Sequence, residues 1–340
     1  MKLNTVEDVN ALWSAATAAA SLGAAIETGL LWLLAEKPAS APEIVQALGI
    51  PGKRGYYWLQ FLEKIGVLEN GPEGYTPAPV VRQAILETHS QESWMHLAID
   101  ERERIAGVSN LGLYIREPGS ILAAQGLPYS EYYVEKMRKS PARAREFTRM
   151  LFEVHQPLAN TVAELLDLTG VQRLMDVGGN SGVVSMALLR KYPALTATVV
   201  DIENVCIAGR EIAAEQGLAD RISYQPIEFA RDEFPTGFDL ILKCDVSVFD
   251  EWLYQKLWRS LKPGGRLAFV EHLAPTETSA PATRVAWTFL DSLQDPDFSI
   301  PTVDQFQSML TRMGFQVLPG QHTFGTGWVF FQARKQQTGR

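Results

Sequence analysis

The strongest chemical signal in the sequence is an acidic, glycine-rich loop at 176–182, which reads DVGGNSG. It follows a short apolar run and leads directly into a helical pattern. Glycines let the chain turn sharply and let a ligand approach the backbone, while the carboxylate of Asp176 can accept hydrogen bonds from a cation. A second acid, Asp201, ends the next apolar run 19 residues after Gly182, where a carboxylate can hold ribose hydroxyls. This spacing predicts a nucleotide-like ligand and fits a nicotinamide or an adenosyl group equally well.

Three further features favour an adenosyl ligand that carries an amino acid. Asp176 precedes the glycines, where a carboxylate would repel a pyrophosphate but attract an ammonium group. Glu228 and Phe229 follow the third apolar run, a position from which they could bind the amino group of adenine and stack on its ring. The segment at 261–267, LKPGGRL, predicts a tight turn into the fifth strand.

Together these motifs resemble those of the S-adenosylmethionine-dependent methyltransferases. The whole chain more specifically resembles the small-molecule O-methyltransferases of plant phenolics and bacterial antibiotics, which join a winged-helix dimerisation domain to an α/β domain. The resemblance extends over nearly all residues and implies S-adenosyl-L-methionine as the cofactor. It also implies a set of cofactor-binding residues, with the last of them at the cofactor-facing end of the fourth strand: Asp176, Gly178, Gly179, Gly182, Asp201, Ile202, Glu228, Phe229 and Lys243.

One position of the loop departs from the family pattern, because Asn180 stands where the family has its third glycine. Asparagine tolerates left-handed backbone angles better than most residues. We therefore expect the loop to bind the cofactor despite this substitution.

A second departure concerns the general base. Members of the family usually carry a His-Asp-Trp run after the fourth strand, and its histidine takes the proton of the substrate hydroxyl. Here the segment 243–251 contains no histidine, and counting from Lys243 places Val248 at that position. The carboxylate that orients the histidine in the family is kept as Glu271, whereas a third carboxylate, expected before the C-terminal helix, falls near Ile300.

The missing histidine leaves three mechanisms open. Holding the reactants together in a dry pocket can supply about 7 to 11 kcal/mol of the barrier, and a general base adds roughly 10²- to 10⁴-fold. Another residue could act as the base, with His155 and Asp245 as the candidates beside Glu271. Alternatively, the acceptor is already an anion or enolate, or the protein binds the cofactor without methylating.

Aromatic and apolar residues predict a wide pocket for a ring-shaped substrate. Met150 falls at the position of the family's pocket methionine, 26 residues before Asp176. The substrate-binding candidates are Met150, Phe152, Trp287 and Phe298. The five histidines show no metal-ligand spacing, so we expect no metal site.

Charge and composition narrow the range of partners and compartments. The 340 residues include 31 Lys and Arg against 39 Asp and Glu, a net charge of −8, which disfavours nucleic acid and anionic lipid as partners. Two cysteines are too few for a disulfide framework. The N-terminus has acids where a signal peptide has cations, and polar residues interrupt the apolar stretch at 15–35. These features predict a cytoplasmic protein with a buried or interface helix pair in place of a membrane span.

The elements that must position these residues fall into two patterns. Seven apolar runs separated by helices predict an α/β fold: a Rossmann-like, seven-stranded, mostly parallel sheet with helices on both faces. The runs lie at 174–177, 197–200, 221–224, 240–243, 267–271, 315–318 and 328–333. Before them, one long helix is expected from 143 to 166, interrupted only by Pro157. The resulting domains are 1–100 for dimerisation, 101–165 for helices of the linker and substrate pocket, and 166–340 for cofactor binding.

The first domain has the helix, turn, helix and β-wing order of a winged helix, over roughly residues 40–77. The segment from Lys37 to Arg82 contains five cationic and four acidic residues. This excess of positive charge is too small for a DNA-binding domain. The second helix instead presents an aromatic surface, at 56–61, that suits a partner subunit. The sequence therefore predicts a homodimeric methyltransferase that acts on oxygen of a small aromatic or polyketide-like metabolite. Transfer to carbon or nitrogen, a cofactor-binding enzyme with other chemistry, and a winged-helix regulator remain as alternatives.

Overall fold

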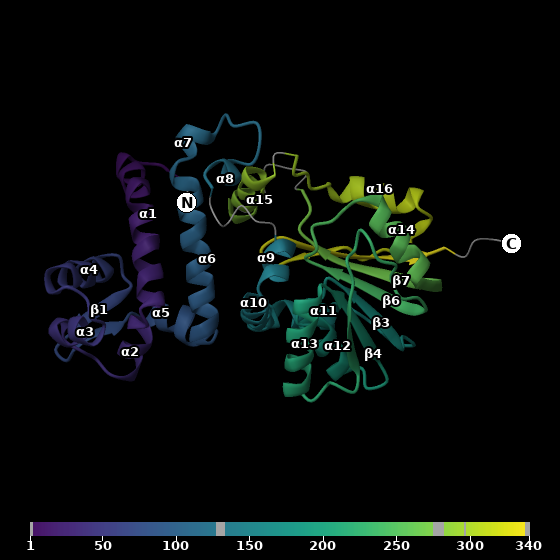
Figure 1. The fold of residues 1–340 in the computed structure, drawn as a ribbon, viewed down its shortest axis with the longest axis horizontal. Helices are drawn as coiled ribbons and strands as arrows, with labels where there is room; N and C mark the ends of the chain where they lie inside the picture. Colours follow the sequence, from purple (N-terminus) through teal and green to yellow (C-terminus); the bar gives the residue numbers. More distant parts are fainter. Residues whose placement is uncertain (1–2, 127–132, 275–281, 296, 337–340) are drawn as a thin grey trace. The chain divides into compact units, whose positions relative to one another are not determined.

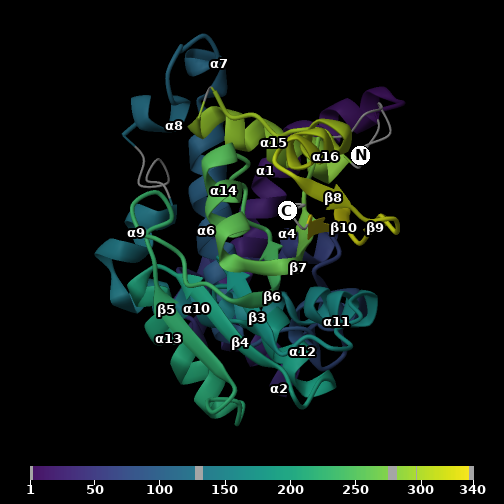
Figure 2. The same cartoon turned by 90° about the vertical axis from the view of Figure 1, so that its right-hand side faces the viewer.

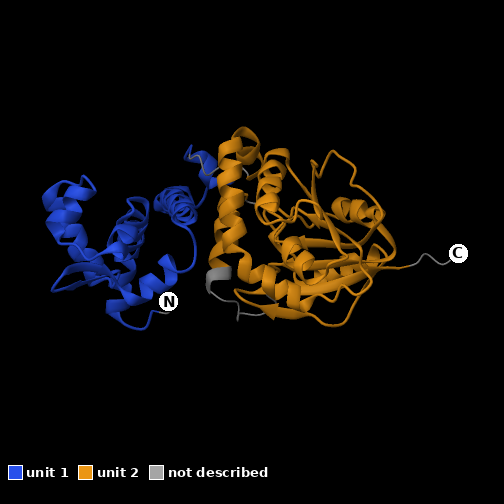
Figure 3. Cartoon of the chain, turned by 90° about the horizontal axis from the view of Figure 1, so that it is seen from below, with its two compact units in different colours: residues 1–130 blue, residues 131–340 orange. Residues whose placement is uncertain are grey.

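The structure, a computed structural model, describes residues 3–126, 133–274, 282–295 and 297–336, with only the backbone of 282–284. The chain forms two units, residues 1–130 and 131–340 (Figure 3). This single division does not coincide with the predicted boundaries at 100 and 165. Helices α10 (Pro141–Val154) and α11 (Gln156–Leu165) belong to the second unit because they pack on its helices α13 and α12.

The first unit contains the predicted helix, turn, helix and hairpin order. Ser40 caps α3, and its N–H donates to the Glu43 carboxylate at 2.8 Å. The strands β1 and β2 pair in antiparallel fashion, from Leu68 opposite Pro77 to Gly71 opposite Gly74. The elements of this unit are α1 (Val6–Glu27), α2 (Leu30–Glu36), α3 (Ala41–Ala47), α4 (Gly52–Lys64), β1 (Leu68–Gly71), β2 (Gly74–Pro77), α5 (Pro79–Val81), η1 (Arg82–Leu86), α6 (Gln91–Ser109), α7 (Leu111–Tyr114) and α8 (Ile121–Ala124).

Helices α1 and α2 divide the apolar stretch at 15–35 between them, because Gly29 breaks the helix with a φ of 73°. Leu30, Leu31 and Leu34 of α2 are buried in the core of the unit. Helix α1 is different: only Ala25 and Ile26 of it are buried, and Trp13 is 85% exposed. Among the described residues α1 is the one helix long and apolar enough to span a membrane. A single helix of this kind is weak evidence for a span, since other apolar helices pass the same test.

The second unit contains the mixed, mostly parallel sheet that was predicted, and its strands follow the order β5-β4-β3-β6-β7-β10-β8 (Figures 1 and 2). Strand β10 is antiparallel and lies between β7 and β8. A short strand, β9, pairs with β10 and was not predicted. The strands are β3 (Arg173–Val177), β4 (Thr196–Asp201), β5 (Ile222–Pro226), β6 (Phe238–Cys244), β7 (Leu261–Glu271), β8 (Phe315–Val317), β9 (His322–Phe324) and β10 (Trp328–Lys335).

Helices cover both faces of this sheet (Figure 2). Alternate residues of a strand point to opposite faces, so Leu240 and Leu242 of β6 join one core while Ile241 joins the other. The first core also receives side chains of α11, α12 and α13, and the second those of α14 and α16. The remaining helices are α9 (Tyr133–Lys139), α12 (Val183–Lys191), α13 (Glu203–Glu215), α14 (Glu251–Ser260), α15 (Ala282–Gln294) and α16 (Val303–Arg312).

The helical segment before β3 breaks two residues before the proline that was expected to interrupt it. Helix α10 ends at Val154, His155 forms the junction with φ −92° and ψ 6°, and Pro157 lies in the first turn of α11. Proline is tolerated there because the first turn of a helix does not use its N–H group. The break therefore places His155 at a bend between two helices.

Candidate active site

A cavity of about 750 Å³ opens at the carboxyl ends of β3, β4 and β6, where ligands bind in sheets of this type. It collects most of the predicted cofactor residues from segments far apart in the sequence. Those that line it are Asp176, Gly178, Gly179, Asp201, Ile202, Glu228 and Phe229. Gly182 lies just behind them as the N-cap of α12, with a φ of 76°.

The glycines of the loop lie so close to neighbouring side chains that no larger residue would fit at their positions. A Cβ atom on Gly179 would lie 2.5 Å from the carboxyl carbon of Asp176, and one on Gly178 would lie 2.5 Å from Cγ2 of Val246. Gly178 also has a φ of 66°, a conformation that other residues adopt only with strain. Both glycines line the cavity, so the backbone at 178–179 borders it without a side chain of its own.

Asn180 adopts the left-handed conformation expected of it, with a φ of 50°. Its N–H donates to Asp201 Oδ2 at 3.0 Å, and its side-chain Nδ2 donates to the phenol oxygen of Tyr133 at 3.0 Å. Its Oδ1 accepts from the N–H of Ser181 at 2.7 Å. A glycine would lack both side-chain contacts, so Asn180 ties the loop to α9.

The two acids of the cavity are buried with neutral hydrogen-bond donors. Asp176 Oδ2 accepts from the hydroxyl of Ser185 at 2.7 Å, while its Oδ1 is buried and has no hydrogen-bond partner among the described residues. Asp201 accepts from the backbone N–H groups of Asn180 and Ile202. Burial raises the pKa of Asp176 to about 6 and that of Asp201 to about 6. The vacant oxygen of Asp176 fits a ligand ammonium, and Asp201 fits ribose hydroxyls.

Glu228 and Phe229 line the cavity from the segment after β5. The Glu228 carboxylate is 3.1 Å from Arg138 and 3.0 Å from Arg231. Phe229 packs against Phe234 with ring centroids 5.4 Å apart. An adenine amino group would therefore share Glu228 with two guanidinium groups.

Lys243 and Glu271 are not placed as predicted, because neither lines the cavity. Their side chains are 0% and 1% exposed, and Lys243 Nζ lies 2.6 Å from Glu271 Oε1. Burial lowers the pKa of Lys243 and raises the pKa of Glu271. The two side chains pair with each other inside the sheet, and neither reaches the cavity wall.

Both remaining candidate bases, His155 and Asp245, line the cavity, as does Val248. Burial lowers the pKa of His155, which leaves its imidazole neutral and able to accept a proton near neutral pH. Asp245 is exposed, has a φ of 56°, and donates its N–H to the Val270 carbonyl at 2.9 Å.

The predicted substrate residues are scattered, and none of them lines this cavity. Met150 is buried within α10, Phe152 packs against the core beside the sheet, and Trp287 lies on α15. The walls come instead from the neighbouring face of the same helices. Phe147, Leu151, His155 and Leu158 follow one another at spacings of four, four and three residues, and this helical period is the signal that could have found them.

Other lining residues were missed because they follow no motif. Tyr133, Val134 and Arg138 come from α9, Trp252 from the first turn of α14, and Val246 and Ser247 from the loop after β6.

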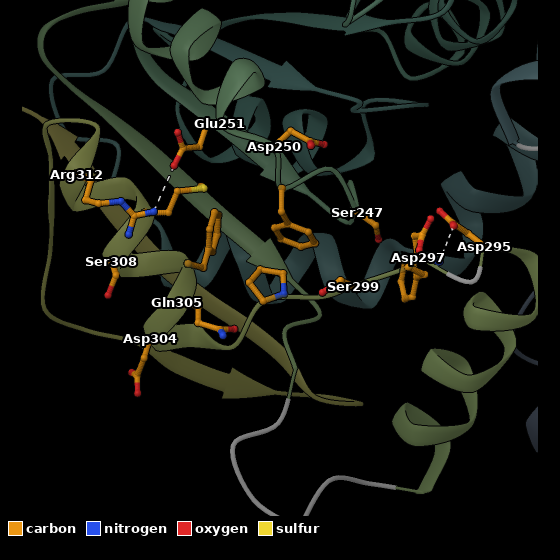
Figure 4. Close-up of a pocket in the computed structure, with 15 residues that line it drawn as sticks. Ser247, Asp250, Glu251, Asp295, Asp297, Ser299, Asp304, Gln305, Ser308 and Arg312 are labelled. Atoms are coloured by element: carbon orange, nitrogen blue, oxygen red, sulfur yellow. Dashed lines mark hydrogen bonds and ion pairs between the residues drawn. The ribbon is translucent and has the colours of Figure 1, made fainter.

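A second cavity, of about 870 Å³, lies beside α14 and α16 and shares Ser247 with the first (Figure 4). Phe298, predicted to bind substrate, lines this one. Glu251 pairs with Arg312 at one end of it, and Asp295 and Asp297 lie at the other. Within the described residues no group of three or more potential ligands could hold a metal ion.

Comparison with known proteins identifies the family. Residues 120–316 match the model of an O-methyltransferase domain. The 3-hydroxy-5-methyl-1-naphthoate 3-O-methyltransferase of Streptomyces sahachiroi is 31% identical over 283 residues, which cover 79% of this chain and 77% of the relative. The L-tyrosine C(3)-methyltransferase of Streptomyces lavendulae is 25% identical, over 91% of this chain and 86% of that enzyme.

The fold agrees with solved structures of such enzymes. Human N-acetylserotonin methyltransferase, solved in complex with S-adenosylmethionine, superposes with a TM-score of 0.80 at 20% identity, over 99% of each chain. The glycine turn at the cavity, the Asp176 oxygen that has no partner among the described residues, and the buried Asp201 fit this cofactor. The chain therefore belongs to the O-methyltransferase family of enzymes that methylate small metabolites with S-adenosyl-L-methionine.

Proposed function

We propose that this enzyme transfers a methyl group to an oxygen atom of a small aromatic or polyketide-like metabolite, with His155 as the base. The observation that carries the proposal is the composition of the cavity of about 750 Å³. One part of its wall holds the acids and glycines of the cofactor site, and another holds Phe147, Leu151 and Leu158 around His155. A flat apolar acceptor with one hydroxyl group fits such a wall.

The cofactor supplies an electrophilic methyl group on a sulfonium sulfur. Asp176 would hold the ammonium of its amino acid, Asp201 its ribose, and Glu228 with Phe229 its adenine. The backbone at Gly178 and Gly179 would let the ligand lie close to the sheet. With the cofactor held in this way, its methyl group and the acceptor would share one cavity, and such positioning can supply about 7 to 11 kcal/mol of the barrier.

The acceptor oxygen must lose its proton as its bond to the methyl carbon forms and the bond between that carbon and sulfur breaks. A neutral imidazole can take this proton, and the burial that lowers the pKa of His155 keeps it neutral. Asp245 is the second candidate, since its backbone lies in the wall formed by the loop after β6.

Transfer to carbon is the second candidate reaction. The position that the family pattern reserves for the catalytic histidine is the apolar Val248, which lines the cavity. One relative is a C(3)-methyltransferase of L-tyrosine. An acceptor that is already an anion or enolate would need no base at this position.

We further propose that the first unit forms a homodimer interface and that the enzyme works in the cytoplasm, without nucleic acid or membrane as partners. Exposed apolar side chains on α1 and α4, among them Trp13 and Tyr57, support a protein interface there. The net charge of −8 disfavours anionic surfaces.

The test begins with the cofactor and a panel of hydroxylated naphthoates and L-tyrosine, whose products are read by mass and fragmentation. We expect methylation on oxygen. Calorimetry should show S-adenosylmethionine binding to the wild type and none to Asp201→Ala. Methyl groups found on carbon would overturn the proposal in favour of the second candidate.

The same assay tests the base. We expect His155→Ala to lower kcat by roughly 10²- to 10⁴-fold, because it removes general-base catalysis, while cofactor affinity stays within about twofold. His322→Ala, on β9 and outside the cavity, is the control and should keep full activity. If neither His155→Ala nor Asp245→Asn lowers kcat, no base acts at these positions and that part of the proposal fails.

A further inference from the structure

The structure contains a buried ion pair, Lys243 and Glu271, that has no part in the proposed chemistry. The two residues lie at the carboxyl ends of the adjacent strands β6 and β7. Lys243 Nζ is 2.6 Å from Glu271 Oε1 and 4.6 Å from the ring centre of Phe249, and both charged groups are shielded from water. Burying two charges costs as much as their attraction returns. An ion pair in this place therefore calls for an explanation other than stability.

Both members of the pair also bind the backbone of one residue, Val246. Lys243 Nζ donates to the carbonyl of Val246, and Glu271 Oε1 accepts from the N–H of Val246 at 3.3 Å. Val246 follows the end of β6 and lies outside any strand. Its backbone groups are thus fixed by side chains where sheet pairing would otherwise fix them.

Val246 in turn touches the cofactor turn. A Cβ atom added to Gly178 would lie only 2.5 Å from Cγ2 of Val246, so the two residues pack closely. Both residues line the cavity. The residues on either side of it, Asp245 and Ser247, line the cavity as well. A shift of the Val246 backbone would therefore move the part of the cavity wall that packs against the glycine turn.

We propose that Lys243 and Glu271 are positioning residues, which hold the carbonyl and the N–H of Val246 and thereby set the distance between the loop after β6 and the glycine turn. The pair shapes the site through the backbone and touches neither cofactor nor acceptor. This role differs from the two that the family resemblance implies, a cofactor contact for Lys243 and the orientation of a histidine for Glu271.

Three variants separate this role from a general contribution to folding. Glu271→Gln keeps an oxygen acceptor for Val246 and Lys243 but removes the charge. Glu271→Leu removes both, and Lys243→Met removes the donor to the Val246 carbonyl. Lys262→Met is the matched control, because Lys262 pairs with Asp239 at 2.6 Å between the same two strands at their other end.

The readouts are the Kd for S-adenosylhomocysteine by calorimetry, the backbone hydrogen exchange of peptides covering 244–250, and thermal unfolding. We expect Glu271→Leu and Lys243→Met to weaken binding by about tenfold or more, the effect of losing one well-placed hydrogen bond, and to speed exchange in 244–250. Glu271→Gln should restore binding to within about threefold of wild type, and Lys262→Met should alter neither readout.

Folded Glu271→Leu and Lys243→Met proteins that bind S-adenosylhomocysteine as the wild type does, with unchanged exchange in 244–250, would overturn the proposal. If Glu271→Leu does not fold, Lys243→Met compared with Glu271→Gln decides the question in the same way. None of these measurements involves an acceptor. Their outcome is therefore independent of whether methyl transfer goes to oxygen or to carbon.

Discussion

At the scale of single residues, the two cavity acids lose hydration when they are buried, and a cationic or hydroxyl-bearing ligand can compensate for that loss. Asp176 and Asp201 are buried, and their hydrogen bonds come from a hydroxyl and from backbone N–H groups. A buried carboxyl group without a cation prefers its proton, which is why its pKa rises to about 6. Since the folded protein binds this proton more tightly than the unfolded chain does, the stabilisation is complete at low pH and is lost as the pH rises toward 6.

A ligand that needs the ionised carboxylates should therefore bind more weakly below pH 6. We expect the affinity for S-adenosylhomocysteine to level off above pH 7 and to fall by about tenfold per pH unit below 6 for each carboxylate that must ionise. Calorimetry between pH 5 and pH 8 measures this. In Asp176→Asn, whose side chain cannot ionise, the profile should become shallower. A pH-independent Kd in the wild type would show that these acids do not contact the ligand as anions.

The sequence predicts which acids and glycines form the cofactor site because one short loop carries most of them. Asp176 and Asp201 end neighbouring parallel strands, and such strand ends always meet at one edge of the sheet. The contact of Lys243 with Glu271 joins residues 28 positions apart, and nothing in their spacing says that both side chains turn inward. Met150 was placed in the pocket by motif distance, whereas the cavity takes Leu151, a rotation of about 100° around the helix.

At the scale of elements, α9 is a short helix that three side chains of the cofactor unit hold in place. Asn180 donates to Tyr133, Glu228 pairs with Arg138, and Asn204 Nδ2 donates to the Met137 and Arg138 carbonyls at 2.9 and 3.1 Å. Seven residues are too few for a stable isolated helix. Its position over the cavity therefore depends on these contacts.

The bond between Asn180 and Tyr133 can be tested by a double-mutant cycle. Asn180→Gly and Tyr133→Phe remove the same hydrogen bond from opposite sides, and glycine adopts the left-handed angle of Asn180 without strain. We expect each variant to speed the dissociation of S-adenosylhomocysteine by about threefold to tenfold, and the double variant to add little more, because contacting residues are not additive. Stopped-flow or surface plasmon resonance measures the rates. Fully additive effects would mean that the two side chains act separately on the ligand.

The helices and strands were easier to predict than the breaks and connections between them. Alternating apolar runs revealed the strands of the sheet, since a buried parallel strand is a continuous apolar run. The break at His155 was missed by two residues because proline marks a helix start as readily as a helix end. Strand β9 spans three residues, His322–Phe324, none of them buried, so it leaves no hydrophobic pattern to detect.

At the scale of the whole molecule, the first unit exposes apolar side chains that a solitary soluble chain rarely leaves uncovered. Val6, Leu12 and Trp13 of α1 are 71%, 48% and 85% exposed. Sequence periodicity could predict the helix, but not whether its apolar face meets the same chain or another one. Covering this face by a second subunit accounts for it without invoking a membrane.

We therefore expect the wild type to sediment as a dimer of the 37.7 kDa chain. Trp13→Glu should shift it toward monomer, because the interface would have to bury an unpaired charge. Ile207→Glu alters an exposed apolar residue of the second unit and should leave the dimer intact. Sedimentation of both variants alike, or flotation of the wild type with lipid vesicles, would argue against this interface.

The position of β10 has a consequence for how the chain is made. In the sheet β10 lies between β7 and β8, although it comes after both in the sequence. During synthesis, one edge of β7 therefore stays unpaired until β10 has emerged. Strand β8 likewise has no strand to pair with until then. An open, apolar strand edge is a template for pairing with other chains. The nascent polypeptide should therefore depend most on chaperones in the interval between translation of residue 271 and residue 335.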